Sequence, residues 1–177
     1  TWLMYSGASL LDLRAIKEQA ITLDIMGLNF YPQWSTTEVY LDRAGRLAHR
    51  VTDKQGTVFG EMIRSYYDRY RVPVMITETS IVGSNKVRSR WLESSVATVR
   101  ELRTAGVPVI GYTWFPLFTM IDWRYRYGQQ PVEAYHLDLG LYTLGKHGEP
   151  RWRATPLVDQ FRGYVGQLDL AVGTLAM

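Results

Sequence analysis

The chain has 177 residues, of which 46% are hydrophobic and 21% are charged. This is the composition of one globular domain and excludes a wholly disordered protein. The sequence holds no cysteine, which excludes disulfide bonds, thiolate metal sites and a cysteine nucleophile. The net charge of +3 is too small and too dispersed to indicate a nucleic-acid partner. No stretch approaches the ~20 apolar residues of a membrane span, so we expect no membrane partner.

The N-terminal residues lack the charged and then apolar pattern of a signal peptide. With no cysteine present either, we expect a cytoplasmic protein. The sequence begins with Thr1 rather than Met, and we expect it to be a piece of a longer protein. Aromatic residues make up 13% of the chain. Their flat apolar faces and single polar atoms suit sugar rings, although a tryptophan-rich core is the simpler explanation.

Apolar residues recur at helical spacing in four segments, and three short apolar runs are typical of buried strands. The expected helices span residues 10–20, 58–70, 91–102 and 155–165. The expected strands span residues 21–31, 74–77 and 107–114, with a further short strand at 139–144. Ser9 is a candidate N-cap of the first helix, and Gly106 a candidate stop of the third. Residues 33–56 are polar and predict a long loop with room for a small hairpin.

Helices and strands therefore alternate along the chain. The strands are continuously apolar rather than alternating, which is typical of parallel strands covered by helices. This pattern predicts an α/β fold, either a doubly wound sheet or part of a (β/α) barrel. No glycine-rich phosphate-binding motif follows any strand, so we expect no nucleotide cofactor. His49, His136 and His147 lack paired spacing, so we expect no metal site.

In both α/β architectures, active residues gather at the C-terminal ends of the strands. Glu78 ends the apolar run VPVMIT, where a carboxylate is unfavourable to desolvate unless it has partners. It is either a nucleophile or general base, or a strand-end residue that turns to solvent or caps the next helix. Asn29 and Tyr31 end the preceding strand and are candidates to donate hydrogen bonds that keep Glu78 ionised and oriented.

The third strand ends at Trp114, and Asp122 and Trp123 follow shortly after it. A carboxylate between two indoles can accept hydroxyl hydrogen bonds while the indoles cover the faces of a sugar ring. These three residues are a candidate sugar platform. The alternative is that Trp114 belongs to the core and Asp122 is an ordinary loop acid. Arg124 and Arg126 follow, either as a binding site for an anionic substituent or as a solvated rim.

Three segments together resemble the last three strands of the family 1 glycoside hydrolases, the β-glucosidase and 6-phospho-β-glucosidase type. They are LDIMGLNFYPQW, VPVMITETS and GVPVIGYTWFPLFTMIDW. The family has a (β/α)8 TIM barrel and cleaves β-glycosidic bonds with retention. The resemblance implies that this chain is the C-terminal portion of such a barrel, about strands six to eight with their helices. It implies a partial barrel domain at residues 1–167 and a C-terminal tail at 168–177.

The resemblance also assigns roles to single residues. Ile76, Thr77 and Glu78 match the first three positions of the family motif I-T-E-N-G, which places Glu78 on the catalytic nucleophile. Asn29 and Tyr31 match the Asn and last Tyr of D-x-x-G-x-N-Y-Y. Trp114 matches the Trp of G-Y-x-x-W with one residue fewer, and Asp122 and Trp123 match E-W with Asp for Glu. The chain departs from the family where Thr79 and Ser80 replace Asn-Gly.

A retaining glycosidase also needs an acid/base, which the family carries in an N-E-P motif of an earlier strand. This sequence has no N-E-P, and its Glu149, in Gly-Glu-Pro, is expected to be a surface turn residue. We therefore expect a carbohydrate substrate and a barrel completed by a separate or longer chain. The predicted function is a retaining β-glycosidase, and the alternative is a non-catalytic carbohydrate-binding or assembly module derived from such a barrel. No cofactor is implied.

Overall fold

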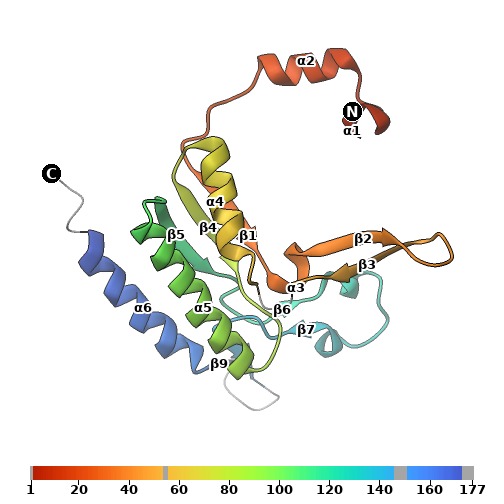
Figure 1. Ribbon diagram of the computed structural model, residues 1–177. Coiled ribbons are helices and arrows are strands. Elements are labelled where there is room, and N and C mark those ends of the chain that lie inside the picture. The colour runs from red at the N-terminus through yellow and green to blue at the C-terminus, as the bar shows by residue number, and fades with distance from the viewer. Residues whose placement is uncertain (1, 54–55, 146–150, 173–177) are drawn as a thin grey trace.

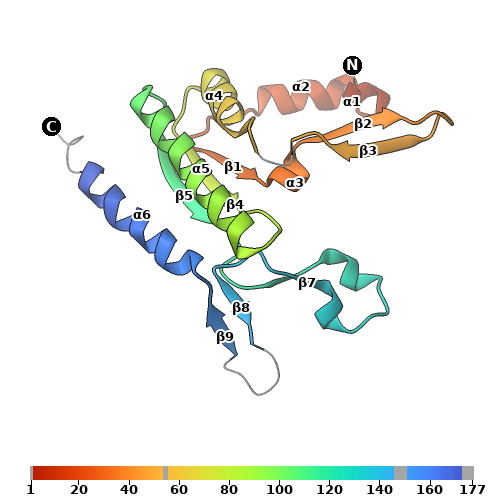
Figure 2. The same cartoon turned by 60° about the horizontal axis from the view of Figure 1, so that its bottom comes forward.

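The computed structural model describes residues 2–53, 56–145 and 151–172 (Figure 1). Its centre is a parallel sheet of three strands in the order β1-β4-β5. The strands are β1 (Met26–Phe30), β4 (Val74–Thr79) and β5 (Val109–Trp114). The helices beside the sheet are α4 (Phe59–Tyr70), α5 (Asn85–Thr104) and α6 (Leu157–Val172). Helices α4 and α5 connect successive strands and cover one face of the sheet, as Figures 1 and 2 show, which confirms the predicted α/β class.

Smaller elements surround this sheet. At the N-terminus are α1 (Trp2–Tyr5) and α2 (Leu10–Glu18). Between β1 and α4 lie α3 (Pro32–Ser35) and the antiparallel hairpin of β2 (Thr37–Leu41) and β3 (Leu47–Val51), which confirms the expected hairpin. After β5 come β6 (Met120–Ile121), the 3-10 turns η1 (Trp123–Arg126) and η2 (Val132–Tyr135), β7 (His136–Leu137), β8 (Tyr142–Leu144) and β9 (Trp152–Ala154). Figure 2 shows the β6–β7 arm and the β8–β9 hairpin extending away from the sheet.

Several element boundaries differ from the predictions. The first strand begins at Met26, five residues later than expected, because residues 21–25 lie outside the sheet and are exposed. Helix α5 begins at Asn85, where the Ser84 side chain accepts a hydrogen bond from a backbone N–H of the first turn. Helix α6 continues to Val172 and so includes the first half of the expected tail at 168–177. Residues 173–177 lie outside the described part of the chain.

The core lies between the sheet and its helices. The rings of Phe30, Phe59 and Trp91 pack together with centroid separations of 5.0 to 5.8 Å. Ile63 and Leu92, from α4 and α5, are fully buried against the same layer. The other face of the sheet is different, since Gly27, Asn29 and Ile110 are exposed there. Apolar burial therefore stabilises one face of this sheet and leaves the second face open.

Helix α2 has a complete capping box but lies apart from the core. Ser9 accepts a hydrogen bond from the backbone of Asp12, and Asp12 accepts one from the backbone of Ser9, which confirms the predicted cap. No residue of α2 is buried, and Leu10, Leu11 and Ile16 are exposed. Within the described residues, α2 therefore has a local N-terminal cap but no buried tertiary contact.

We predict that Leu92→Ala lowers the free energy of unfolding by about 2–5 kcal/mol, because it empties a fully buried site between α5 and the sheet. Leu47→Ala is the matched control, since Leu47 is exposed on β3, and its effect should stay within about 0.5 kcal/mol. Urea unfolding followed by circular dichroism measures both. Equal effects of the two substitutions would contradict the assignment of the core.

Candidate active site

Glu78 lies near the C-terminal end of β4, where the pairing of the sheet is irregular. Leu28 pairs with Ile76, but the next residue, Asn29, pairs with Glu78, so that Thr77 is an extra residue in β4. Thr77 and Glu78 are both partly exposed, between the buried Ile76 and Thr79. Such a bulge changes the face toward which the following side chain points. Both Thr77 and Glu78 are therefore directed toward the open face of the sheet.

The structure brings together the three residues predicted at the ends of the first two strands. The Tyr31 hydroxyl donates a hydrogen bond of 2.6 Å to Oε2 of Glu78. Burial, and then the Glu78 carboxylate, raise the pKa of Tyr31, so this phenol remains a donor. Asn29 is the register partner of Glu78, and its Oδ1 accepts a hydrogen bond of 2.6 Å from the Thr77 hydroxyl. Strand pairing thus places Asn29, Tyr31 and Glu78 side by side.

Thr79, which replaces the family's Asn, holds the strand end from the buried side. Its hydroxyl donates to the carbonyl of Phe30 at 2.6 Å and accepts from Nε1 of Trp91 at 3.1 Å. These two bonds join β4 to β1 and to α5 within the core. Thr79, the residue next to Glu78 that differs from the family, is therefore hydrogen-bonded to Trp91 in the core.

The structure places Trp114 in the core, which is one of the two alternatives that the sequence left open. The Trp114 ring is only 5% exposed and donates from Nε1 to the carbonyl of Leu139 at 2.9 Å. Trp114 pairs in register with the buried Thr79 and so lies on the helix-covered face of the sheet. The next residue, Phe115, is 38% exposed, and its backbone N–H donates to the carbonyl of Thr79 at 3.0 Å. Phe115 is thus an exposed aromatic residue bonded through its backbone to the strand end that carries Glu78, and it was not among the residues predicted from the sequence.

Asp122 and Trp123 lie on the β6–β7 arm. Asp122 caps η1: its Oδ1 accepts from the backbone of Arg124, and its Oδ2 accepts from Nε and Nη2 of the same arginine. These bonds to Arg124 lower the pKa of Asp122 and occupy three of about four acceptor positions on its carboxylate. Trp123 is 66% exposed, and the guanidinium of Arg126 lies 4.4 Å from its ring centroid. In the candidate anion site, Arg124 is therefore already paired with Asp122, and Arg126 already packs on Trp123.

A residue that the sequence analysis did not single out connects the two groups. Trp34, on α3, has its ring centroid 5.3 Å from that of Tyr31. The same indole lines a cavity of about 540 Å3 together with Asp122 and Trp123. The position of Trp34, three residues after Tyr31 and at the end of the strand motif, was the available signal.

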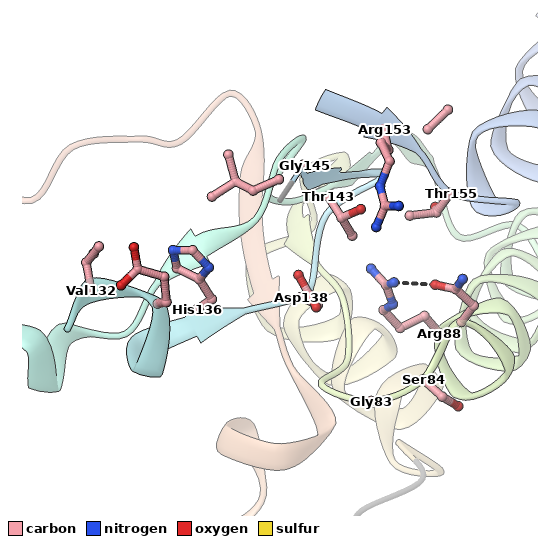
Figure 3. A pocket seen from close by; sticks show the side chains of 14 residues that line it. Gly83, Ser84, Arg88, Val132, His136, Asp138, Thr143, Gly145, Arg153 and Thr155 are labelled. Atoms are coloured by element: carbon pink, nitrogen blue, oxygen red, sulfur yellow. Dashed lines mark hydrogen bonds between the residues drawn. The ribbon is translucent and has the colours of Figure 1, made fainter. Parts of the chain in front are cut away.

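A larger cavity, of about 1340 Å3, lies elsewhere and is lined by none of the predicted site residues. Figure 3 shows the guanidinium groups of Arg88 and Arg153 directed toward it, with Asp138 on the opposite side. Arg88 is 2% exposed, donates to the carbonyl of Gly140 at 2.7 Å and bonds Asn85. Burial lowers the pKa of Arg88, while Asp138 acts in the opposite direction. The contact with Gly140 gives Arg88 a structural role, because it joins α5 to the segment that receives the Trp114 indole.

Within the described ranges, no group of three or more His, Asp and Glu side chains could hold a metal ion. No helix there is both long enough and apolar enough to cross a bilayer. His147 and Glu149 lie outside the described residues.

We predict that Tyr31 ionises late in an alkaline titration. Its raised pKa means that it stabilises the folded state below about pH 10, the ordinary tyrosine value, and that this contribution is lost as the pH rises through the folded pKa. Tyr31→Phe should therefore remove absorbance change from the last part of the titration. The exposed Tyr5 is the matched control, because Tyr5→Phe removes the same chromophore without touching Glu78. Loss of amplitude near pH 10 in Tyr31→Phe would contradict the contact.

The fold is similar to solved β-glucosidase structures. A β-glucosidase from Exiguobacterium marinum has a TM-score of 0.65 and 18% identity, over 90% of this chain and 38% of that chain. The GH1 β-glucosidase from Exiguobacterium antarcticum B7 has a TM-score of 0.69 and 17% identity, over 94% of this chain and 39% of that chain. The family 1 β-glucosidase from Thermotoga maritima in complex with isofagomine lactam has a TM-score of 0.61 and 19% identity, over 88% and 36%.

This chain thus spans less than two fifths of the length of each of these proteins. Neither a protein-family model nor a curated protein sequence matches it. At the level of the fold, the comparisons confirm the resemblance predicted from three motifs. The chain is similar in fold to part of the TIM barrel of the family 1 β-glucosidases.

Proposed function

We propose that this chain is the part of a retaining β-glycosidase that carries the catalytic nucleophile, and that it corresponds to about strands six to eight of the barrel. The observation that carries the proposal is the position of Glu78. It lies at the C-terminal end of a parallel strand, directed toward the open face, with the Tyr31 hydroxyl 2.6 Å from its carboxylate. Active residues of barrel enzymes occupy this position. The similarity in fold to β-glucosidases supports the same class.

In the proposed reaction, a carboxylate oxygen of Glu78 attacks the anomeric carbon of the substrate. The bond to the leaving-group oxygen breaks, and that oxygen takes a proton from the acid/base residue. Water then hydrolyses the glycosyl-enzyme, with its proton returning to the acid/base. Tyr31 orients Glu78 and supports its ionised form through the hydrogen bond. The acid/base, at ~5–5.5 Å from the nucleophile in retaining enzymes, comes from a barrel part outside this sequence.

The proposed sugar contacts come from the strand next to Glu78, from the residue after β5 and from the β6–β7 arm. Asn29, on the adjacent strand, contacts a sugar hydroxyl or the nucleophile. Phe115 and Trp123 offer exposed ring faces to the sugar, and Trp114 supports this wall from within the core. Asp122 keeps about one free acceptor position for a hydroxyl group, because Arg124 occupies the others.

A second candidate is a non-catalytic carbohydrate-binding or assembly module. One observation favours it: the carboxylate of Asp122, which stands where the family's E-W motif has Glu, is already paired with Arg124. Such a module would bind sugars without consuming them.

We predict that Glu78→Gln, in the protein that contains this chain, lowers the hydrolysis of nitrophenyl β-glucosides by about a thousandfold or more, because the amide cannot attack the anomeric carbon. The matched control is Glu61→Gln, at an exposed position of α4, which should keep its activity. A fluorinated glycosyl fluoride, which forms a slowly hydrolysed glycosyl-enzyme, should label the peptide that contains Glu78. Unchanged turnover in Glu78→Gln, or a label on another residue, would overturn the proposal. Sugar binding by the native protein without any turnover would support the module instead.

A further inference from the structure

The cavity of about 1340 Å3 shown in Figure 3 is lined by the start of α5, by η2 and β7, and by the β8–β9 hairpin. None of the described residues that line it has a part in the proposed function. Its lining includes five ionisable side chains, those of Arg88, Glu133, His136, Asp138 and Arg153. The cavity therefore favours a charged ligand over an apolar one.

The wall formed by α5 and β9 is cationic. Figure 3 shows the guanidinium groups of Arg88 and Arg153 directed toward the same space. Like charges that face one cavity repel each other, and an anion between them offsets this repulsion. Ser84 and Asn85, at the start of the 20-residue helix α5, line the same cavity, and the positive end of the helix dipole also favours an anion. This wall therefore fits an anionic group.

Arg88 holds an unused hydrogen-bond donor in this wall. Its side chain is 2% exposed, and burial lowers its pKa, because the surroundings disfavour the charged form. Of its five N–H donors, one at Nη1 bonds the carbonyl of Gly140 and one at Nη2 bonds Asn85. Among the described residues, its buried Nε has no hydrogen-bond partner. Buried donors without a partner are rare in folded proteins, and a carboxylate would supply both an acceptor and a compensating charge.

The opposite wall is acidic. Asp138 lies across the cavity from the two guanidinium groups in Figure 3, and its charge counteracts the effect of burial on the pKa of Arg88. Its Oδ1 accepts a hydrogen bond of 3.0 Å from the Thr119 hydroxyl, which orients the carboxylate. Glu133, in η2, is exposed and lines the cavity together with His136. These two acids repel a multiply charged anion and attract a cationic group at the far end of a ligand.

We propose that this cavity binds a small zwitterion, whose carboxylate lies against Arg88 and Arg153 and whose ammonium group lies near Glu133 and Asp138. An ω-amino acid, with its two charges at the ends of a short chain, is the simplest compound of this class. The cavity is larger than the ~300–1,000 Å3 of common small-molecule sites, so water accompanies such a ligand. The inference does not rest on the proposed function, because Glu78 does not line this cavity.

The test is a set of calorimetric titrations of the protein that contains this chain. The probes are glycine, 4-aminobutyrate and 6-aminohexanoate, which differ in the separation of their charges. Each is compared with the carboxylate and the amine of the same chain length, and inorganic phosphate is the comparison for a plain anion. At least one amino acid should bind about tenfold or more tightly than its two singly charged analogues, because only the amino acid satisfies both walls.

Two substitutions examine the walls separately. Arg153→Gln and Asp138→Asn each remove one charge at an exposed position, so folding should not depend on them. Each should weaken binding of the amino acid by about tenfold, and Arg153→Gln alone should also weaken binding of the carboxylate analogue. The matched controls are Arg162→Gln on α6 and Asp68→Asn on α4, which make the same charge changes at exposed positions outside the cavity and should leave both affinities within about twofold.

Arg88→Lys keeps the charge but removes the Nε donor, and it should weaken binding of the amino acid as well. Circular dichroism shows whether this variant is folded, and Arg153→Gln and Asp138→Asn carry the test if it is not. Equal binding of the amino acids and their carboxylate analogues, no binding of any amino acid, or unchanged affinity in both wall variants would overturn the inference. Tighter binding of phosphate than of every amino acid would overturn it in favour of a plain anion site. Glu78→Gln should leave all these affinities unchanged.

Discussion

A shift of one residue in the pairing of β1 with β4 determines which face of the sheet carries Glu78. In an unbroken strand Glu78 would share a face with Ile76 and point into the apolar layer beneath the helices, where a carboxylate is unfavourable to desolvate. With Thr77 as the extra residue, Glu78 points to the open face, within reach of the Tyr31 hydroxyl. Thr79 then returns to the buried side, where it bonds Trp91. The bulge thus lets Ile76 and Thr79 lie in the core while Glu78 stays on the open face.

The same alternation of side chains explains why Trp114, the last residue of β5, is buried while Phe115, the next residue, is exposed. Trp114 pairs in register with the buried Thr79 and belongs to the core, whereas Phe115, one residue later, faces outward. The indole of Trp114 still contributes to the site indirectly. Its hydrogen bond to Leu139, together with that of Arg88 to Gly140, holds the chain that returns from the β6–β7 arm. These two core contacts therefore anchor the segment that follows the β6–β7 arm.

The described residues leave one face of the sheet uncovered. Parallel sheets are normally covered on both faces, and in a barrel the inner face is enclosed by the remaining strands. Here Asn29 and Ile110 are exposed on that face, and α2 buries none of its apolar residues. The similar β-glucosidases are more than twice as long as the part that this chain covers. Under the proposed function, the additional strands both enclose the apolar face and supply the acid/base, so that stability and catalysis are completed by the same contacts.

The sequence by itself determined the parallel α/β class, the order of the main helices and strands, and the two strand ends that carry Asn29, Tyr31 and Glu78. These depend on local apolar spacing and on a rule shared by all parallel sheets, so no long-range contact is needed to infer them. Only the tertiary structure decided that Trp114 is buried while Phe115 is exposed, that Arg124 occupies Asp122, and that Trp34 joins the two halves of the site. Each of these depends on a single-residue change of register or on a contact between distant segments. Hydrophobic spacing along the chain predicts neither of them.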